Sequence, residues 1–222
     1  MIFSERRFLC ILFCLLVAAA HGQPLHVVDK PIVFDAQRRQ LTLDYLKEHY
    51  GLNPDGPTIN PTMVVVHWTV YPTLEQSYNA FYAPTLPDNR AGIRHAGALN
   101  VSSHYLIDRD GTIYQLMPDT LMARHVIGLN HCAIGIENVG DGQKHPLTSA
   151  QFEANLRLIE HLAKKYPINY VIGHHEYPHF IGHPNWKEKD PTYLTEKDDP
   201  GDAFMMRLRS RLTQLSLNEV PQ

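Results

Sequence analysis

The sequence predicts a single α/β domain in which a central mixed β-sheet is flanked by helices. Residues 62–69 contain consecutive apolar residues, mostly valine, as is typical of a strand buried on both faces. Residues 102–116 form two alternating apolar runs around Asp110-Gly111, a strong signal for a β-hairpin. Residues 148–166 carry apolar side chains at helical spacing, with Thr148 placed to cap the helix and Pro167 placed to end it.

The remaining elements follow from the same patterns. We expect helices ending at Tyr50 and over residues 72–81, and a closing helix over residues 202–215. Further strands are expected over residues 133–140 and 168–172. The resulting division is a leader (1–20), an N-terminal extension without evident chemistry (21–61), one domain (62–215) and a C-terminal tail (216–222).

Length and charge exclude some classes of protein. The chain has 222 residues, a formal net charge of −3 and no long charged block, which favours one domain with an extension. Such a balance of acidic and basic residues gives no indication of the basic surface that binds nucleic acid. The 14 histidines fit either a metal site or a tolerant surface.

The N-terminus has the pattern of a secretory signal peptide. Arg6 and Arg7 precede a short apolar run over residues 8–17, and alanines at 18–20 form a cleavage motif. We expect cleavage after Ala20 or Gly22, an exported protein that is periplasmic or secreted, and no stable membrane insertion afterwards. The alternative is an uncleaved membrane anchor, which the short apolar run disfavours. Cleavage leaves Cys132 as the one cysteine, so no internal disulfide is expected.

Polar residues at strand ends indicate a site. His67 ends the strand over residues 62–69, and His174 follows the strand over residues 168–172. Ligands gather at strand ends in open α/β sheets, so we expect these histidines to face each other, although His67 also fits a hydrogen-bonded core histidine. Glu137 interrupts an apolar strand, where a carboxylate is costly unless it is paired or used.

The segment 171–201, VIGHHEYPHFIGHPNWKEKDPTYLTEKDDPG, is rich in metal-capable side chains and allows two zinc hypotheses. His175 and His179 spell H-E-x-x-H, the zinc-protease motif, but Pro178 would lie inside the helix that this motif needs. The second hypothesis combines His67, His174 and Asp199, because catalytic zinc takes three protein ligands and an open position. Asp190 and Asp198 are rival third ligands.

Five ordered motifs resemble a known family. They are His67-Trp68-Thr69, the hairpin SHYLIDRDGTIYQ at 103–115, Asn130 followed by Ile134-Gly135-Ile136-Glu137, Gly173-His174, and Asp199-Pro200-Gly201. Together they look like the zinc-dependent N-acetylmuramoyl-L-alanine amidases of the type 2 family, the fold of T7-type phage lysozyme and peptidoglycan recognition proteins. The resemblance covers about residues 60–215.

The resemblance implies hydrolysis of the amide bond between N-acetylmuramic acid and L-alanine in peptidoglycan or muropeptides. It implies Zn²⁺ bound by His67, His174 and Asp199, with Glu137 and Lys197 as catalytic residues. The position where one branch of the family has a catalytic tyrosine is Ser103 here. It also implies that His104, His125 and Asn130 bind the substrate. A non-catalytic peptidoglycan-binding module remains an alternative, and the peptidase built on His175 and His179 is a weaker one.

One departure from the family pattern is the long segment between His174 and Asp199. Residues 178–193 include Phe180, His183, Trp186 and Tyr193. Because loops on a rigid scaffold often carry specificity and aromatic side chains stack well on sugars, we expect one wall of the substrate cleft here, with Trp186 in contact with substrate. The alternative is a flap packed on itself.

Overall fold

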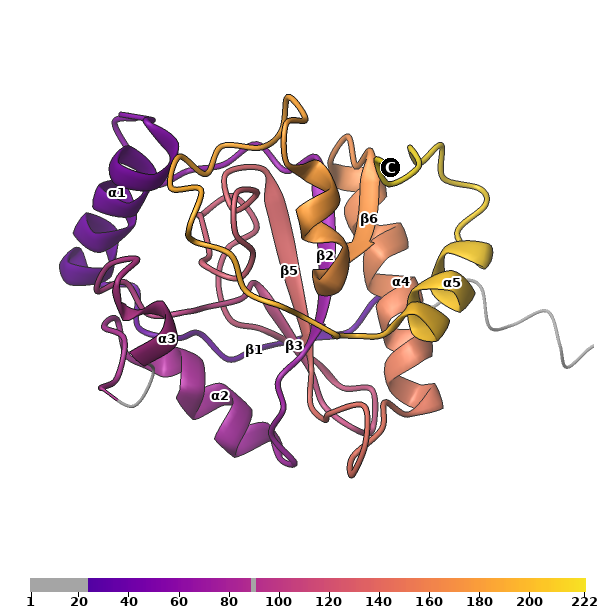
Figure 1. The fold of residues 1–222 in the computed structure, drawn as a ribbon. Coiled ribbons are helices and arrows are strands. Elements are labelled where there is room, and N and C mark those ends of the chain that lie inside the picture. Colours follow the sequence, from indigo (N-terminus) through magenta and orange to yellow (C-terminus); the bar gives the residue numbers. More distant parts are fainter. Residues whose placement is uncertain (1–23, 89–90) are drawn as a thin grey trace, which may run out of the picture.

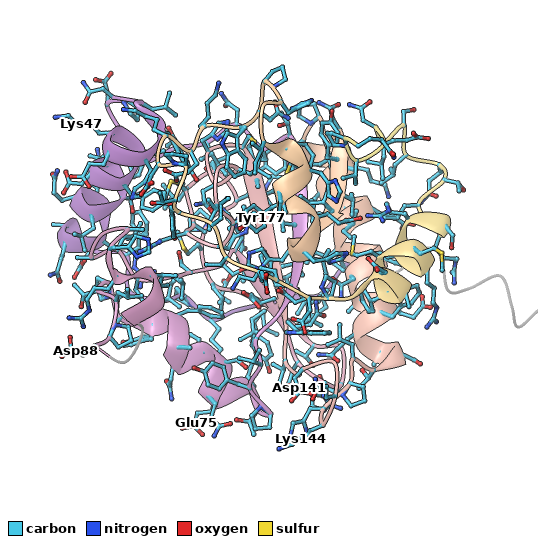
Figure 2. All side chains as sticks on the ribbon, viewed as in Figure 1. Lys47, Glu75, Asp88, Asp141, Lys144 and Tyr177 are labelled. Atoms are coloured by element: carbon cyan, nitrogen blue, oxygen red, sulfur yellow. The ribbon has the colours of Figure 1, made fainter. Side chains whose placement is uncertain are left out.

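The computed structural model describes residues 24–88 and 91–222, which form a six-stranded mixed sheet with helices on both faces (Figure 1). The expected signal peptide over residues 1–20 lies outside the described residues. Charged side chains such as Lys47, Glu75 and Lys144 project outward, whereas Tyr177 lies within the molecule (Figure 2). Among the described helices, none combines the length and apolar character that a bilayer crossing requires.

The sheet confirms the predicted mixed topology. Its order is β1-β4-β3-β5-β2-β6, in which β3 and β4 are antiparallel and the other neighbours are parallel. The predicted hairpin is present, and Gly111 occupies its turn at φ 86°, where a Cβ would lie 2.8 Å from the Ala150 carbonyl oxygen. The strands are β1 (Val27–Asp29), β2 (Met63–Trp68), β3 (Tyr105–Ile107), β4 (Ile113–Gln115), β5 (Ala133–Asn138) and β6 (Tyr170–Gly173).

The two faces of the sheet bury different clusters. On β2, Val64 and Val66 pack toward α4 and α5, whereas Met63 and Val65 pack toward α1 and the 3₁₀ helix η1. Figure 1 shows α4 and α5 on one side of the strands and α1 and α2 on the other. The helices are α1 (Ala36–Tyr50), α2 (Leu74–Tyr82), α3 (Ala91–Arg94), α4 (Ser149–Lys165), η1 (His174–Phe180) and α5 (Asp202–Ser210).

Helix ends follow local chemistry. Thr148 caps α4 as predicted, and Gln151 Oε1 accepts from the Thr148 backbone N–H at 2.9 Å, which completes a capping box. The closing helix is shorter than predicted, because α5 ends at Ser210 and the chain continues in tight turns such as Leu212 N–H to Arg209 C=O at 3.0 Å. The predicted helix over 72–81 is confirmed as α2.

The N-terminal extension, which was expected to lie outside the domain, contributes residues to its sheet and core. β1, which the sequence pattern did not reveal, pairs with β4 and adds an edge strand to the sheet. α1 contributes Tyr45, Leu46 and Tyr50 to the cluster that also contains Met63 and Val65. Residues 27–50 therefore belong structurally to the same body as residues 62–215.

The long segment expected after β6 begins as a 3₁₀ helix rather than a loop. η1 runs through Pro178, which we expected to prevent a helix, and the Pro178 carbonyl accepts a bond from Ile181 N–H at 3.1 Å. Residues 181–198, here called the strap, then cross to α1 and return toward α5 (Figure 1). Lys187 N–H bonds to Gly128 C=O and Lys189 N–H to His49 C=O.

Candidate metal centre

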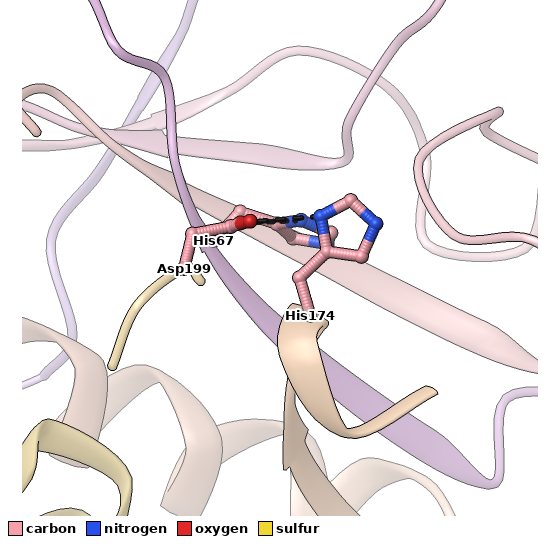
Figure 3. Close-up of side chains that lie close together, drawn as sticks. All are labelled: His67, His174 and Asp199. Atoms are coloured by element: carbon pink, nitrogen blue, oxygen red, sulfur yellow. Dashed lines mark hydrogen bonds and ion pairs between the residues drawn. The ribbon is translucent and has the colours of Figure 1, made fainter. Parts of the chain in front are cut away.

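Three buried side chains from distant parts of the chain meet at one point. His67 comes from the end of β2, His174 begins η1 directly after β6, and Asp199 follows the strap. Asp199 Oδ2 lies 3.3 Å from His67 Nδ1 and 3.2 Å from His174 Nδ1 (Figure 3). One ligand atom from each residue lies within 4.8 Å of the other two. Among the described residues, this is the group of histidine, cysteine and carboxylate side chains that is arranged to hold a metal ion.

Strand register explains how the two histidines meet. β6 lies parallel to β2 with Gly173 opposite Val66, so His174 leaves the sheet beside His67. Asp199 is positioned through its backbone, since its carbonyl accepts from His175 N–H at 3.0 Å. On the other side of β2, Glu137 is the register partner of His67, so both side chains lie on the same face of the sheet.

The surroundings of His67 and Asp199 favour the protonation states that bind metal. Burial, together with the nearby His174, lowers the pKa of His67 to about 4 and keeps its imidazole neutral near pH 7. Burial alone would raise the pKa of Asp199, but the nearby imidazoles, first His174 and then His67, outweigh it and hold that pKa well below its usual range. Metal binding needs an unprotonated imidazole nitrogen and an ionised carboxylate, so these shifts of His67 and Asp199 suit a hydrolytic zinc site.

The H-E-x-x-H residues have other partners. His175 contacts the Asp199 carbonyl through Nδ1 and Asp202 Oδ1 through Nε2, each at 2.9 Å. Glu176 accepts from Gly173 N–H at 2.7 Å and pairs with both terminal nitrogens of Arg209 at 2.8 and 2.9 Å. His179 is exposed. In the structure, Glu176 therefore caps η1, and the ion pairs of His175 and Glu176 connect η1 to α5.

The rival carboxylates also lie elsewhere. Asp190 accepts bonds from the backbone and side chain of Thr192 at 2.8 and 2.6 Å, and Asp198 is exposed. Neither belongs to the metal-capable group, in which Asp199 stands as the carboxylate.

A cavity of about 480 Å³ opens beside the three residues. Glu137, Lys197, His125 and Asn130 line it together with His67, His174 and Asp199. Glu137 is 8% exposed, whereas Lys197 is exposed at the rim. A buried carboxylate from β5 and a lysine from the strap therefore line the same cavity as the candidate metal centre.

Two expected substrate-binding residues do not line this cavity. His104 is fully buried, where its Nδ1 accepts from Gly135 N–H at 3.0 Å and its Nε2 lies 2.8 Å from the Leu121 carbonyl oxygen. Trp186 stacks on Tyr177 with ring centroids 6.2 Å apart. These contacts assign His104 to the sheet and Trp186 to the core around η1.

The two other expected substrate-binding residues lie at the cavity with many of their polar groups already occupied. Asn130 Oδ1 accepts from the backbone N–H groups of His125 and Val126 at 2.9 and 2.8 Å, and its Nδ2 donates to Tyr50 Oη at 2.9 Å. His125 Nδ1 lies 3.0 Å from His67 Nε2. Both therefore support the shape of the site.

Sequence reasoning missed part of the cavity wall. Its lining includes Tyr45 of α1 and Arg124, besides Tyr193 of the segment that was expected to form a cleft wall. The strap thus reaches the cavity through Tyr193 and residues 195–198, whereas its His183 and Trp186, and Phe180 at the end of η1, are absent from the lining. Tyr193 was among the aromatic residues noted in the sequence, but no pattern distinguished Tyr45 from its core neighbours on the same helix.

Comparisons with known proteins agree with one another. The family model described as N-acetylmuramoyl-L-alanine amidase matches residues 57–202, more than half of the chain. The chain is 31% identical over 188 residues to the 1,6-anhydro-N-acetylmuramyl-L-alanine amidase AmpD of Citrobacter freundii, covering 78% of this chain and 90% of that protein. It is 32% identical over 104 residues to the endolysin of Escherichia phage T7, covering 41% of this chain and 69% of the endolysin.

The fold itself is similar to solved structures. The N-acetylmuramoyl-L-alanine amidase LysC from Clostridium intestinale URNW superposes with a TM-score of 0.54 at 19% identity, covering 86% of this chain and 99% of that one.

Proposed function

The chain belongs to the N-acetylmuramoyl-L-alanine amidase family, and we propose that it is a zinc-dependent enzyme that cleaves the amide bond between N-acetylmuramic acid and L-alanine in peptidoglycan or muropeptides. The observation that carries the zinc proposal is the meeting of His67, His174 and Asp199 beside a cavity that Glu137 and Lys197 also line. Two imidazoles and one carboxylate match the ligand sets of hydrolytic zinc sites.

The donor set fits zinc by its chemistry. All three candidate ligand atoms are acceptors, and they are buried and grouped within 4.8 Å of one another. A cation offsets the repulsion that ionised and lone-pair acceptors exert on each other in such a site. When bound, zinc supplies Lewis-acid chemistry, which makes water a nucleophile near neutral pH and polarises an amide carbonyl.

The chain's own residues then move the protons. We assign Glu137 as the general base that accepts a proton from the attacking water and then donates it to the L-alanine amine as the amide bond breaks. Its register position opposite His67 supports this role. We assign Lys197 to stabilise the negative charge that develops on the amide oxygen, because it is the lysine that lines the cavity.

Export belongs to the proposal as well. The signal pattern over residues 1–20 supports a mature protein that meets wall peptidoglycan or periplasmic fragments rather than a cytoplasmic pool. Fractionation of expressing cells with an antibody to the chain tests this part, because export predicts a shortened protein outside the cytoplasm.

Product analysis tests the activity. The chain from His21 onward is loaded with zinc and incubated with purified peptidoglycan and, separately, with a soluble 1,6-anhydro muropeptide. Mass spectrometry should find free stem peptides that begin with L-alanine, together with glycan lacking peptides, and a chelator should abolish both. Cuts within the stem peptide would support a peptidase instead. Binding of peptidoglycan without cleavage by the zinc-loaded protein would make the chain a recognition module.

A further inference from the structure

We propose that His125 is a positioning residue that determines which ring nitrogen of His67 carries the proton. By doing so it presents the Nδ1 lone pair of His67 to the metal centre. The proposal rests on the zinc site described above, and it gives His125 a role other than contact with substrate.

The proton arrangement follows from a chain of hydrogen bonds that ends on a backbone carbonyl. His67 Nε2 lies 3.0 Å from His125 Nδ1, and His125 Nε2 lies 3.2 Å from the Ala133 carbonyl oxygen. A carbonyl oxygen can only accept, so His125 Nε2 must carry a proton. A neutral His125 then accepts at Nδ1, and His67 must donate from Nε2. This leaves Nδ1 of His67 with its lone pair.

That lone pair faces another acceptor. His67 Nδ1 lies 3.3 Å from Asp199 Oδ2. With the opposite tautomer, His67 would donate Nδ1–H to Asp199 and close the site with a hydrogen bond. The bond from His67 to His125 opposes that closure, because both arrangements need the single proton of a neutral imidazole. His125 therefore keeps the pair His67 and Asp199 ready for a cation.

The His125 ring lies in a cradle formed by Asn130, Gly135 and His67. Its backbone N–H donates to Asn130 Oδ1 at 2.9 Å. Gly135 lies beneath the ring so closely that a Cβ there would come within 2.8 Å of His125 Cγ and 3.0 Å of His125 Cδ2. The rings of His67 and His125 meet edge to face, with centroids 5.1 Å apart and planes at 86°. Gly135 thus lets the ring approach β5 while its Nδ1 points at His67.

Two substitutions separate hydrogen bonding from packing. His125→Phe keeps a ring in the cradle but removes both nitrogens. His125→Asn keeps an oxygen that can accept from His67 Nε2, close to the place of the native Nδ1. Outer-shell partners of metal ligands typically contribute 10- to 100-fold in affinity, so His125→Phe should weaken zinc binding by about that factor. His125→Asn should lose less.

The decisive measurement is the tautomer of His67 in the zinc-free protein, from two-bond ¹H–¹⁵N correlations of the histidine rings. Signals of His67 are assigned by their absence from His67→Ala. The proposal predicts a protonated Nε2 and a bare Nδ1 in the native chain and in His125→Asn, and a mixed or reversed tautomer in His125→Phe. Zinc affinity is measured by competition with a chromogenic chelator on variants whose circular dichroism matches that of the native chain.

The outcomes separate this proposal from the proposed function. A protonated Nδ1 on His67 in the native chain would overturn the role of His125, even if the enzyme binds zinc and cleaves muropeptides. An unchanged tautomer and unchanged zinc affinity in His125→Phe would also overturn it. If the native chain has the expected tautomer but binds no zinc, the role of His125 stands and the zinc-dependent function fails. Because the first test uses the native chain, misfolding of His125→Phe would not remove it.

Discussion

Replacement of Glu188 by alanine tests how the strap is anchored. Glu188 is buried, and both of its carboxylate oxygens contact His49 Nδ1 of α1, at 2.9 and 3.1 Å. Its Oε1 also accepts from the backbone N–H groups of Lys189 and Asp190 at 3.0 and 2.9 Å. Glu188→Ala removes these acceptors, although Lys189 N–H retains the His49 carbonyl at 2.9 Å. In the variant, His49 Nδ1 and Asp190 N–H no longer have the Glu188 carboxylate as a partner.

The expected cost follows from those two donors. A buried donor that loses its acceptor costs about 1–3 kcal/mol, so the loss of acceptors for two donors in Glu188→Ala should lower the free energy of unfolding by about 2–6 kcal/mol. Zinc affinity should change much less, because separate contacts hold the end of the strap. Tyr177 Oη bonds to both the N–H and the C=O of Thr195 at 2.8 Å, and Asp199 C=O accepts from His175 N–H.

Chemical denaturation of the zinc-free protein measures the first quantity, and chelator competition measures the second. Glu188→Gln is the matched control, because its amide oxygen can still accept from Asp190 N–H, and it should be destabilised less. Leu194→Ala, at an exposed strap position, should leave both quantities near their native values. An unchanged free energy of unfolding in Glu188→Ala would refute the anchoring role. A fall in zinc affinity as large as the loss of stability would refute the independence of the two ends.

Three other predictions concern the site and its support. Glu137→Gln should retain zinc but lose about 10²- to 10⁴-fold in kcat, and an unchanged rate with muropeptide would remove Glu137 as the general base. Gly135→Ala should cost about 1–3 kcal/mol of stability by overpacking, because the new Cβ would meet His125 Cγ at 2.8 Å, and thermal unfolding that matches the native chain would contradict this. Burial lowers the pKa of His104 to about 4 from an ordinary 6.5, so the stability its neutral form contributes is present above pH 6.5 and is lost as pH falls toward 4. This loss amounts to at most about 1.4 kcal/mol per pH unit, and denaturation at several pH values should show a shallower dependence in His104→Asn, whereas identical slopes would contradict it.

The sheet and the metal-capable residues were predictable because strand periodicity and strand ends are local signals. The valine run of β2 predicted a buried strand, and the histidine at its end predicted a site at that edge. The same reasoning placed His174 after β6. Asp199 needed the resemblance to a family as well, because a long and irregular segment separates it from His174.

Contacts between distant segments were not predictable from local pattern. Trp186 has the side chain of a sugar-binding residue, but tertiary packing places it against Tyr177 and Gly128. His104 lies within the hairpin motif that resembles the family, yet its ring accepts a hydrogen bond from the backbone N–H of Gly135 in β5. Tyr45 lies on a helix whose apolar pattern predicts only core packing, and the return of the strap over α1 makes it part of the cavity wall.

We propose that His67, together with His174 and Asp199, holds the zinc that amidase activity requires. The direct measurement is the zinc content and the muropeptide cleavage rate of His67→Ala, compared with His179→Ala. His179 belongs to the H-E-x-x-H match but is exposed and lies outside the metal-capable group. We predict that His67→Ala loses both zinc and activity while His179→Ala keeps both. Retained zinc and activity in His67→Ala, or their loss in His179→Ala, would contradict the assignment.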